Sequence, residues 1–111
     1  MTPEGRVLAA CLDYLHARKI FAWRNNSGAV KYQNAEGRGR FLRFGYVGSS
    51  DIIGVLPDGR FLAVECKAEK GRVSEAQRFF LSEVTKLGGV SVVAKSIEDV
   101  AAVLAAEGYK A

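Results

Sequence analysis

The sequence predicts an α/β fold in which one mixed central β-sheet is flanked by α-helices. Apolar residues recur at helical spacing over residues 7–15. Two short apolar runs, 51–56 and 60–67, flank a tight turn, as the strands of a β-hairpin do. The mostly apolar run VSVVA at 90–94 is typical of a buried strand. A length of 111 residues suits a single domain spanning residues 1–111.

The N-terminal half is expected to begin with a helix. Residues 2–4 combine an N-cap threonine, a proline at the first helical position and an acid in the first turn. The helical pattern ends near Lys19, and residues 20–24 and 41–47 indicate short strands. The segment between these strands is polar and contains glycine, which predicts a loop or an irregular hairpin.

The C-terminal half is expected to alternate helix, strand and helix. Residues 74–77 (SEAQ) match a capping box and begin a helix that ends at Gly88. The buried strand at 90–94 follows, and Ser96 caps a last helix that ends at Gly108. The predicted order is therefore α-β-β-β-β-α-β-α, with all strands in one sheet.

Composition argues against a membrane or secreted protein. No run approaches the roughly 18 apolar residues of a membrane helix. Charged residues interrupt the apolar positions at the N-terminus, so no secretory signal is expected. Cys11 and Cys66 lack the spacing of a zinc site or a disulfide framework. We therefore expect no membrane association and a cytoplasmic location.

A basic segment lies between residues 18 and 46. It contains seven basic residues against the single acid Glu36, with aromatic residues interleaved. This composition suits a polyanion backbone and stacked bases, and it equally suits a solvated basic face. The seven are Arg18, Lys19, Arg24, Lys31, Arg38, Arg40 and Arg43.

The turn of the 51–67 hairpin decides which side chains face each other. A three-residue loop at 57–59 would use proline at the first central position and a left-handed glycine, and it would place Asp51 opposite Glu65. A two-residue Asp-Gly loop would instead place Asp51 opposite Cys66 and put the two acids on different faces. We favour the three-residue loop because it explains Pro57 as well as the glycine.

In that register the hairpin predicts a metal site. Asp51 and Glu65 would be like charges directly opposite each other, which destabilises an empty sheet. Lys67 lies two residues beyond Glu65 and projects from the same face. Mg²⁺ prefers oxygen ligands, and the backbone carbonyl of Cys66 is a further candidate. Lys67 would position or deprotonate the attacking water. The alternative is a surface hairpin with an ordinary Glu-Lys pair.

The pattern D-x13-E-x-K on a hairpin, formed here by Asp51, Glu65 and Lys67, resembles the PD-(D/E)xK nuclease superfamily. The wider pattern looks like the VRR-NUC domain, in its stand-alone form from bacteriophages and bacteria. The resembling stretches are PEGRVLAACLDYLHARKIFAWRNNSG, GSSDIIGVLPDGRFLAVECKAEKGRVSEAQ and the final strand and helix. Ser50 departs from the pattern, since it stands where the name of the motif has proline; that position shapes the turn and supplies no chemistry.

The resemblance implies a restriction-endonuclease-like fold and cleavage of DNA phosphodiester bonds with Mg²⁺ or Mn²⁺. It also implies kinship with Holliday-junction resolvases, which act as dimers. Asp51 and Glu65 match the metal ligands and Lys67 matches the catalytic lysine. Glu4 matches an acid of the first helix that joins the site, although it could serve only the helix N-terminus. Gln77 matches a supporting position, although it could serve only the capping box.

Further polar and basic residues are candidates for DNA binding. They lie within and after the basic segment, and turn formation or solvated charge would also explain them. The candidates are Arg24, Asn25, Asn26, Ser27, Lys31, Arg38, Arg40, Arg43, Lys70 and Arg72.

The sequence thus predicts a metal-dependent, structure-selective DNA endonuclease that acts on branched DNA such as Holliday junctions as a homodimer. Its location would be the cytoplasm of a bacterium, or of the host cell if a phage encodes it. Three alternatives stay open: a DNA-binding module of the same fold that does not cleave, a nuclease acting on linear duplex DNA or RNA, and a basic structural protein. The preferred junction and the number of metal ions are not specified by the sequence.

Overall fold

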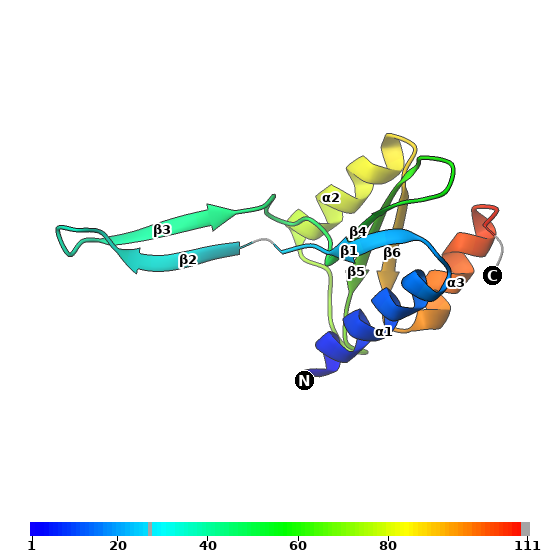
Figure 1. Ribbon diagram of the computed structural model, residues 1–111, viewed down its shortest axis with the longest axis horizontal. Helices are drawn as coiled ribbons and strands as arrows, with labels where there is room; N and C mark the ends of the chain where they lie inside the picture. Colours follow the sequence, from blue (N-terminus) through cyan, green and yellow to red (C-terminus); the bar gives the residue numbers. More distant parts are fainter. Residues whose placement is uncertain (27, 110–111) are drawn as a thin grey trace.

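A computed structural model describes residues 1–26 and 28–109, with all side chains in these ranges except those of residues 29, 30, 43 and 44. The described chain combines three helices with six strands, which confirms the predicted α/β class (Figure 1). The elements are α1 (Pro3–Ala17), β1 (Phe21–Arg24), β2 (Gly28–Gln33), β3 (Gly39–Phe44), β4 (Ile52–Val55), β5 (Phe61–Cys66), α2 (Glu75–Lys86), β6 (Val90–Ala94) and α3 (Ile97–Ala106).

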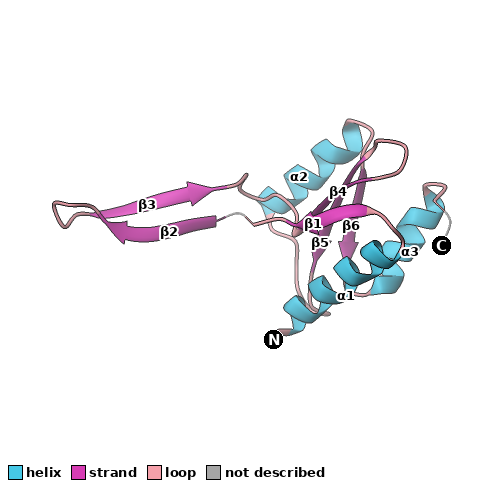
Figure 2. Ribbon diagram, viewed as in Figure 1, coloured by secondary structure: helices cyan, strands magenta, loops and turns pink. Residues whose placement is uncertain are grey.

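The main sheet has four strands in the order β1-β4-β5-β6. β1, β4 and β5 are antiparallel neighbours, whereas β6 runs parallel to β5, so the predicted mixed sheet is confirmed. Alternate residues of β5 enter two different cores. Leu62, Val64 and Cys66 pack with α1 and α3 on one face, and Ala63 packs with α2 on the other (Figure 2).

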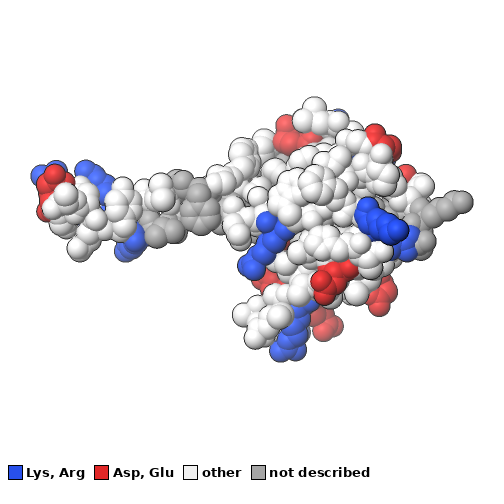
Figure 3. All heavy atoms as spheres, in the orientation of Figure 1, with Lys and Arg blue, Asp and Glu red and all other residues white. Residues whose placement is uncertain are grey.

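The strands β2 and β3 differ from the prediction. Within the described structure they pair only with each other and form a separate two-stranded sheet, where the sequence predicted a loop or an irregular hairpin and one strand of the main sheet. The β2–β3 hairpin therefore projects from the domain and lengthens the molecule to 56 Å (Figures 1 and 3).

The helix caps follow the sequence signals closely. The Thr2 hydroxyl accepts a hydrogen bond from the backbone N–H of Gly5, and α1 begins at the next residue, Pro3. Ser74 and Gln77 form the complete capping box of α2. Ser96 is the N-cap of α3, but its side chain makes no capping hydrogen bond. None of the helices within residues 1–26 and 28–109 combines the length and the apolar character that crossing a bilayer requires.

Gly48 fixes the loop that leads into β4. Its φ of +89° is a left-handed conformation, and a Cβ atom there would lie 2.6 Å from the backbone oxygen of Ala76 in α2. Only glycine allows this close approach of loop and helix. Gly48 thereby sets the path of the chain into Asp51, the residue before β4.

A pair of glycine substitutions tests this packing. Gly59 has a similar φ of +92° but no neighbouring atom within 4 Å of the added Cβ. We expect Gly59→Ala to cost about 1–2 kcal/mol of unfolding free energy from backbone strain alone. Gly48→Ala should cost clearly more, because the loop or α2 must also move. Urea unfolding followed by circular dichroism measures both values, and equal costs would contradict the proposed packing.

Candidate metal centre

The turn between β4 and β5 has the three-residue form that the sequence favoured. The backbone N–H of Leu56 donates to the carbonyl of Arg60 at 2.9 Å, which closes the loop around residues 57–59. Gly59 occupies the left-handed conformation that such a loop requires. The expected turn chemistry is therefore confirmed.

This turn brings two carboxylates to the same end of the hairpin. Ile52 pairs with Val64, so the same register sets Asp51, directly before β4, against Glu65. The Asp51 carboxylate is held there, because its Oδ2 accepts a hydrogen bond of 2.7 Å from the backbone N–H of Cys66. One oxygen of Asp51 is thus fixed by the backbone of β5, beside the Glu65 side chain.

Glu65 is a buried acid without full hydrogen bonding. Only 1% of it is exposed, and its Oε1 has no hydrogen-bond partner among the described residues. Burial and, second, the neighbouring Asp51 raise the pKa of Glu65 to about 8, although Lys67 acts in the opposite direction. A buried oxygen without a hydrogen bond costs free energy, so the environment of Glu65 suits a carboxylate that binds a ligand.

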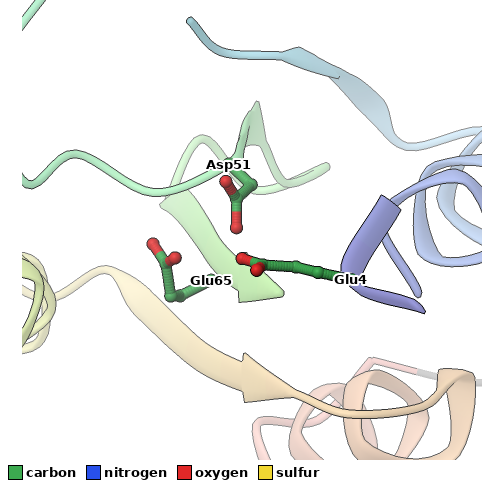
Figure 4. A group of neighbouring side chains, drawn as sticks. All are labelled: Glu4, Asp51 and Glu65. Atoms are coloured by element: carbon green, nitrogen blue, oxygen red, sulfur yellow. The ribbon is translucent and has the colours of Figure 1, made fainter. Parts of the chain in front are cut away.

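Glu4 joins these carboxylates from a third element. It lies in the first turn of α1, where the Thr2 cap and Pro3 fix the start of the helix. Carboxylate oxygens of Glu4, Asp51 and Glu65 all lie within 4.8 Å of one another (Figure 4). The structure therefore brings together three acids that are far apart in the sequence.

Lys67 completes the cluster as its only basic member among the described residues. Its Nζ lies 3.6 Å from Oε2 of Glu65 and 4.0 Å from Oε1 of Glu4. The backbone N–H of Lys67 donates to the carbonyl of Ala94, which fixes this position beside β6. The expected placement of Lys67 on the same side as Glu65 is confirmed by the short distance.

Asn25 holds the loop before Asp51 and is a feature that sequence reasoning missed. Its amide nitrogen donates to Ser49 Oγ at 2.8 Å and to the Ser50 carbonyl at 3.0 Å. Its backbone N–H donates to the Asp51 carbonyl at 2.7 Å. The residues next to Asn25 in the sequence do not predict these contacts, because the contacts join segments 24–26 residues apart. Asn25 therefore supports the loop that carries Asp51 into the carboxylate cluster, and its role toward DNA stays a prediction.

The donor set fits a divalent cation. Three carboxylates converge from α1, the residue before β4, and β5, and one of them keeps an unpaired buried oxygen within the described structure. Mg²⁺ and Mn²⁺ favour such oxygen ligands. Coordination by the Cys66 carbonyl remains a prediction.

Gln77 lies outside this carboxylate cluster. Its Oε1 accepts a hydrogen bond from the backbone N–H of Ser74 at 2.9 Å, and its own backbone N–H donates to Ser74 Oγ. The structure thus places Gln77 in the capping box, which was the alternative to a supporting role in the site. A role of Gln77 in catalysis stays a prediction.

The candidate DNA-binding residues divide into three groups. One is the end of β1 and the turn after it, the second is the projecting hairpin, and the third is the exposed loop after β5. Ser27 and the Arg43 side chain lie outside the described part of the structure. The groups are Arg24, Asn25 and Asn26; Lys31, Arg38 and Arg40; and Lys70 and Arg72.

Comparison with known proteins gives a family. A family model described as the VRR-NUC domain matches residues 2–98. The chain belongs to the VRR-NUC family. Searches of curated proteins and of solved structures gave no match. The matched range includes every member of the carboxylate cluster and Lys67.

Membership places the chain in a nuclease-type family, which suggests a hydrolase and implies DNA as the substrate. The mixed sheet with three helices is consistent with the restriction-endonuclease-like fold. The acidic cluster is consistent with the divalent metal use that a nuclease family suggests. The VRR-NUC match and the geometry of the cluster thus agree.

The raised pKa of Glu65 makes a prediction about metal-free stability. Because the folded pKa lies above the ordinary value of 4.5, the folded state holds this proton more tightly than the unfolded state. The contribution of Glu65 to stability is therefore full below pH 4.5 and is lost as pH rises through about 8. We expect the stability difference, Glu65→Gln minus wild type, to rise by about 1.4 kcal/mol per pH unit within that window.

Urea unfolding in chelator at half-unit pH steps measures this difference. Glu83→Gln is the matched control, because Glu83 is a carboxylate outside the cluster that pairs with Lys86 on α2. Its difference from wild type should not rise across the same window. Parallel pH profiles for wild type and Glu65→Gln would contradict the burial argument.

Proposed function

We propose that this chain is a metal-dependent endonuclease that hydrolyses phosphodiester bonds of DNA. One observation supports it above all: three carboxylates and a lysine converge in a nuclease-family domain, with one buried carboxylate oxygen lacking a hydrogen bond within the described residues. Asp51, Glu65 and Glu4 would hold Mg²⁺ or Mn²⁺, with the Cys66 carbonyl as a further ligand. When bound, such a cation polarises a phosphoryl oxygen and lowers the pKa of water.

The residues of the chain supply positioning and charge. Asp51 keeps one oxygen on the Cys66 backbone N–H, so its carboxylate cannot rotate freely. Lys67 projects its ammonium beside Glu65 and Glu4, where it would orient the attacking water and offset negative charge on the phosphate. Gln77 would support the site only through the first turn of α2.

The proposed substrate is branched DNA, such as a Holliday junction. Family kinship to junction resolvases supports this choice. Arg24 at the end of β1 and Lys70 and Arg72 in the loop after β5 are exposed basic residues, which supports contact with phosphates. A cytoplasmic location is proposed with this function.

Substitution of Asp51 tests the chemistry. Asn at this position keeps an oxygen that can accept from the Cys66 N–H but removes the charge, so the fold should persist while metal binding weakens. We expect Asp51→Asn and Lys67→Ala each to lower cleavage of a labelled four-way junction by about 100-fold or more in Mg²⁺. Lys86→Ala, a surface lysine paired with Glu83, is the control and should cleave normally.

The same reactions in chelator and on flap, linear duplex and RNA substrates define the specificity. Cleavage should stop in chelator and should be fastest on the junction. Retarded but uncut DNA in every metal would favour the binding module. Equal cutting of linear duplex or RNA would overturn structure selectivity while leaving the nuclease assignment intact.

We also propose that the protein acts as a homodimer. An apolar row crosses the α2 face of the sheet, because Phe21 pairs with Val55 and Val55 with Phe61, and all three are exposed. Phe79 and Leu87 of the α2 region are 57% and 85% exposed. Contiguous apolar surface of this kind supports protein contact rather than DNA contact.

Sedimentation of the purified protein tests the dimer. We expect about twice the 12.0 kDa chain mass for wild type. Phe79→Asp with Leu87→Asp should shift the protein toward the monomer, because two charges would be buried at the contact. A wild-type monomer, with and without junction DNA, would contradict the proposal.

A further inference from the structure

The β2–β3 hairpin lacks support from the rest of the domain. Described residues 31–33 and 35–42 are exposed, and the hairpin projects away from the rest of the domain (Figure 1). An isolated two-stranded hairpin is marginally stable in water. Its tip is nevertheless ordered locally, since Asn34 Oδ1 accepts from the backbone N–H groups of Glu36 and Arg38. Such a projecting hairpin is suited to contact with a partner.

The chemistry of the hairpin indicates a polyanion. Its described charges are Lys31, Arg38 and Arg40 against the single acid Glu36. Each of two cross-strand pairs sets a cation beside a ring: Lys31 faces Phe41, and Tyr32 faces Arg40. Lys31 Nζ lies 5.7 Å from the centre of the Phe41 ring.

The aromatic rings of these pairs are accessible. Phe41 is 64% exposed and Tyr32 is 50% exposed. Cations that alternate with exposed rings are typical of surfaces that contact nucleic acids. The excess of three cations over one acid on so small a sheet favours a phosphate backbone over a second protein chain.

The base of the hairpin is attached to the metal centre. Asn25, three residues before β2, donates hydrogen bonds to the Ser49 hydroxyl and to the backbone carbonyls of Ser50 and Asp51, in the segment that follows β3. Both strands therefore leave the domain beside Asp51. A strand of six residues extends about 20 Å, which equals the length of about six base pairs.

We propose that the β2–β3 hairpin is an arm that lies in the major groove of duplex DNA next to the cleaved phosphate. The major groove is wide enough for a two-stranded β-ribbon. The arm would add phosphate contacts along about six base pairs on one side of the metal centre. This inference rests on the proposed function and adds the DNA element that the arm recognises, a continuous duplex flank.

A shortened arm is the direct test. Val30 pairs with Leu42, so replacing residues 31–41 with Asn-Gly joins them by a two-residue turn that suits a hairpin. Binding is measured by fluorescence anisotropy in chelator, with labelled blunt duplexes from 8 to 30 base pairs. The affinity of each protein should rise with duplex length until the duplex covers its whole contact surface. For wild type this rise should continue for about six base pairs beyond the length at which the affinity of the variant levels off. For the longest duplex the variant should bind at least about tenfold more weakly.

Salt dependence gives a test that does not alter the backbone. Arg40→Ala should reduce the slope of log K against log salt by about 0.9 for one lost phosphate contact. Lys86→Ala removes one exposed positive charge from α2 and is the matched control. Its slope should equal that of wild type. Equal slopes for Arg40→Ala and wild type would overturn contact between Arg40 and phosphate.

The outcomes separate the arm from the nuclease assignment. If wild type binds and cuts DNA, and the shortened arm has the same length dependence, the arm proposal fails alone. If the arm increases affinity for single strands as much as for duplexes, contact with the groove is excluded. If wild type neither binds nor cuts DNA, the proposed function fails and the arm proposal fails with it.

Discussion

Glu65 places a carboxylate in the interior of the domain, opposite Asp51 and beside Lys67. The two acids repel each other, and one Glu65 oxygen has no hydrogen bond within the described residues. A neutral, protonated Glu65 is one way to relieve this strain, and a bound cation is the other. The rest of the site is arranged so that the second way is available, because Glu4 and Asp51 supply further oxygens at the same point.

The surrounding fold keeps these groups in register. The three-residue turn fixes the β4–β5 pairing, and the Asn25 hydrogen bonds fix the loop that carries Asp51. The close approach of Gly48 to α2 determines how that loop enters the sheet. Lys67 is fixed from the other side by the backbone of Ala94. The positions of Asp51 and Lys67 therefore depend on backbone contacts, which are less mobile than side chains alone.

The sequence predicted those features that depend on local chemistry. The caps at Thr2 and Ser74 and the turn at Gly59 are set by neighbouring residues, so they could be recognised without a structure. Once the turn was recognised, counting residues back from it gave the pairing register of β4 and β5. The approach of Glu4 depends on how α1 packs across the domain, and only the family resemblance suggested it. The Asn25 contacts were missed for the same reason, since they join distant segments.

The β2–β3 hairpin was harder to predict because both of its faces are exposed. A strand that packs on a core alternates apolar and polar residues, whereas residues 28–33 (GAVKYQ) show this alternation only over their last four positions. The sequence therefore left a choice between a loop and an irregular hairpin. A segment that makes its main contacts with another molecule need not show the pattern of a segment that packs on its own domain.

Diffraction from a crystal soaked in Mn²⁺, recorded at an energy where manganese scatters anomalously, tests the metal centre most directly. The account predicts one or two anomalous peaks between the carboxylates of Asp51, Glu65 and Glu4, with metal–oxygen distances of about 2.1 Å. A fully soaked crystal without a peak at this position, or with Asp51 and Glu65 on opposite faces of the sheet, would contradict it.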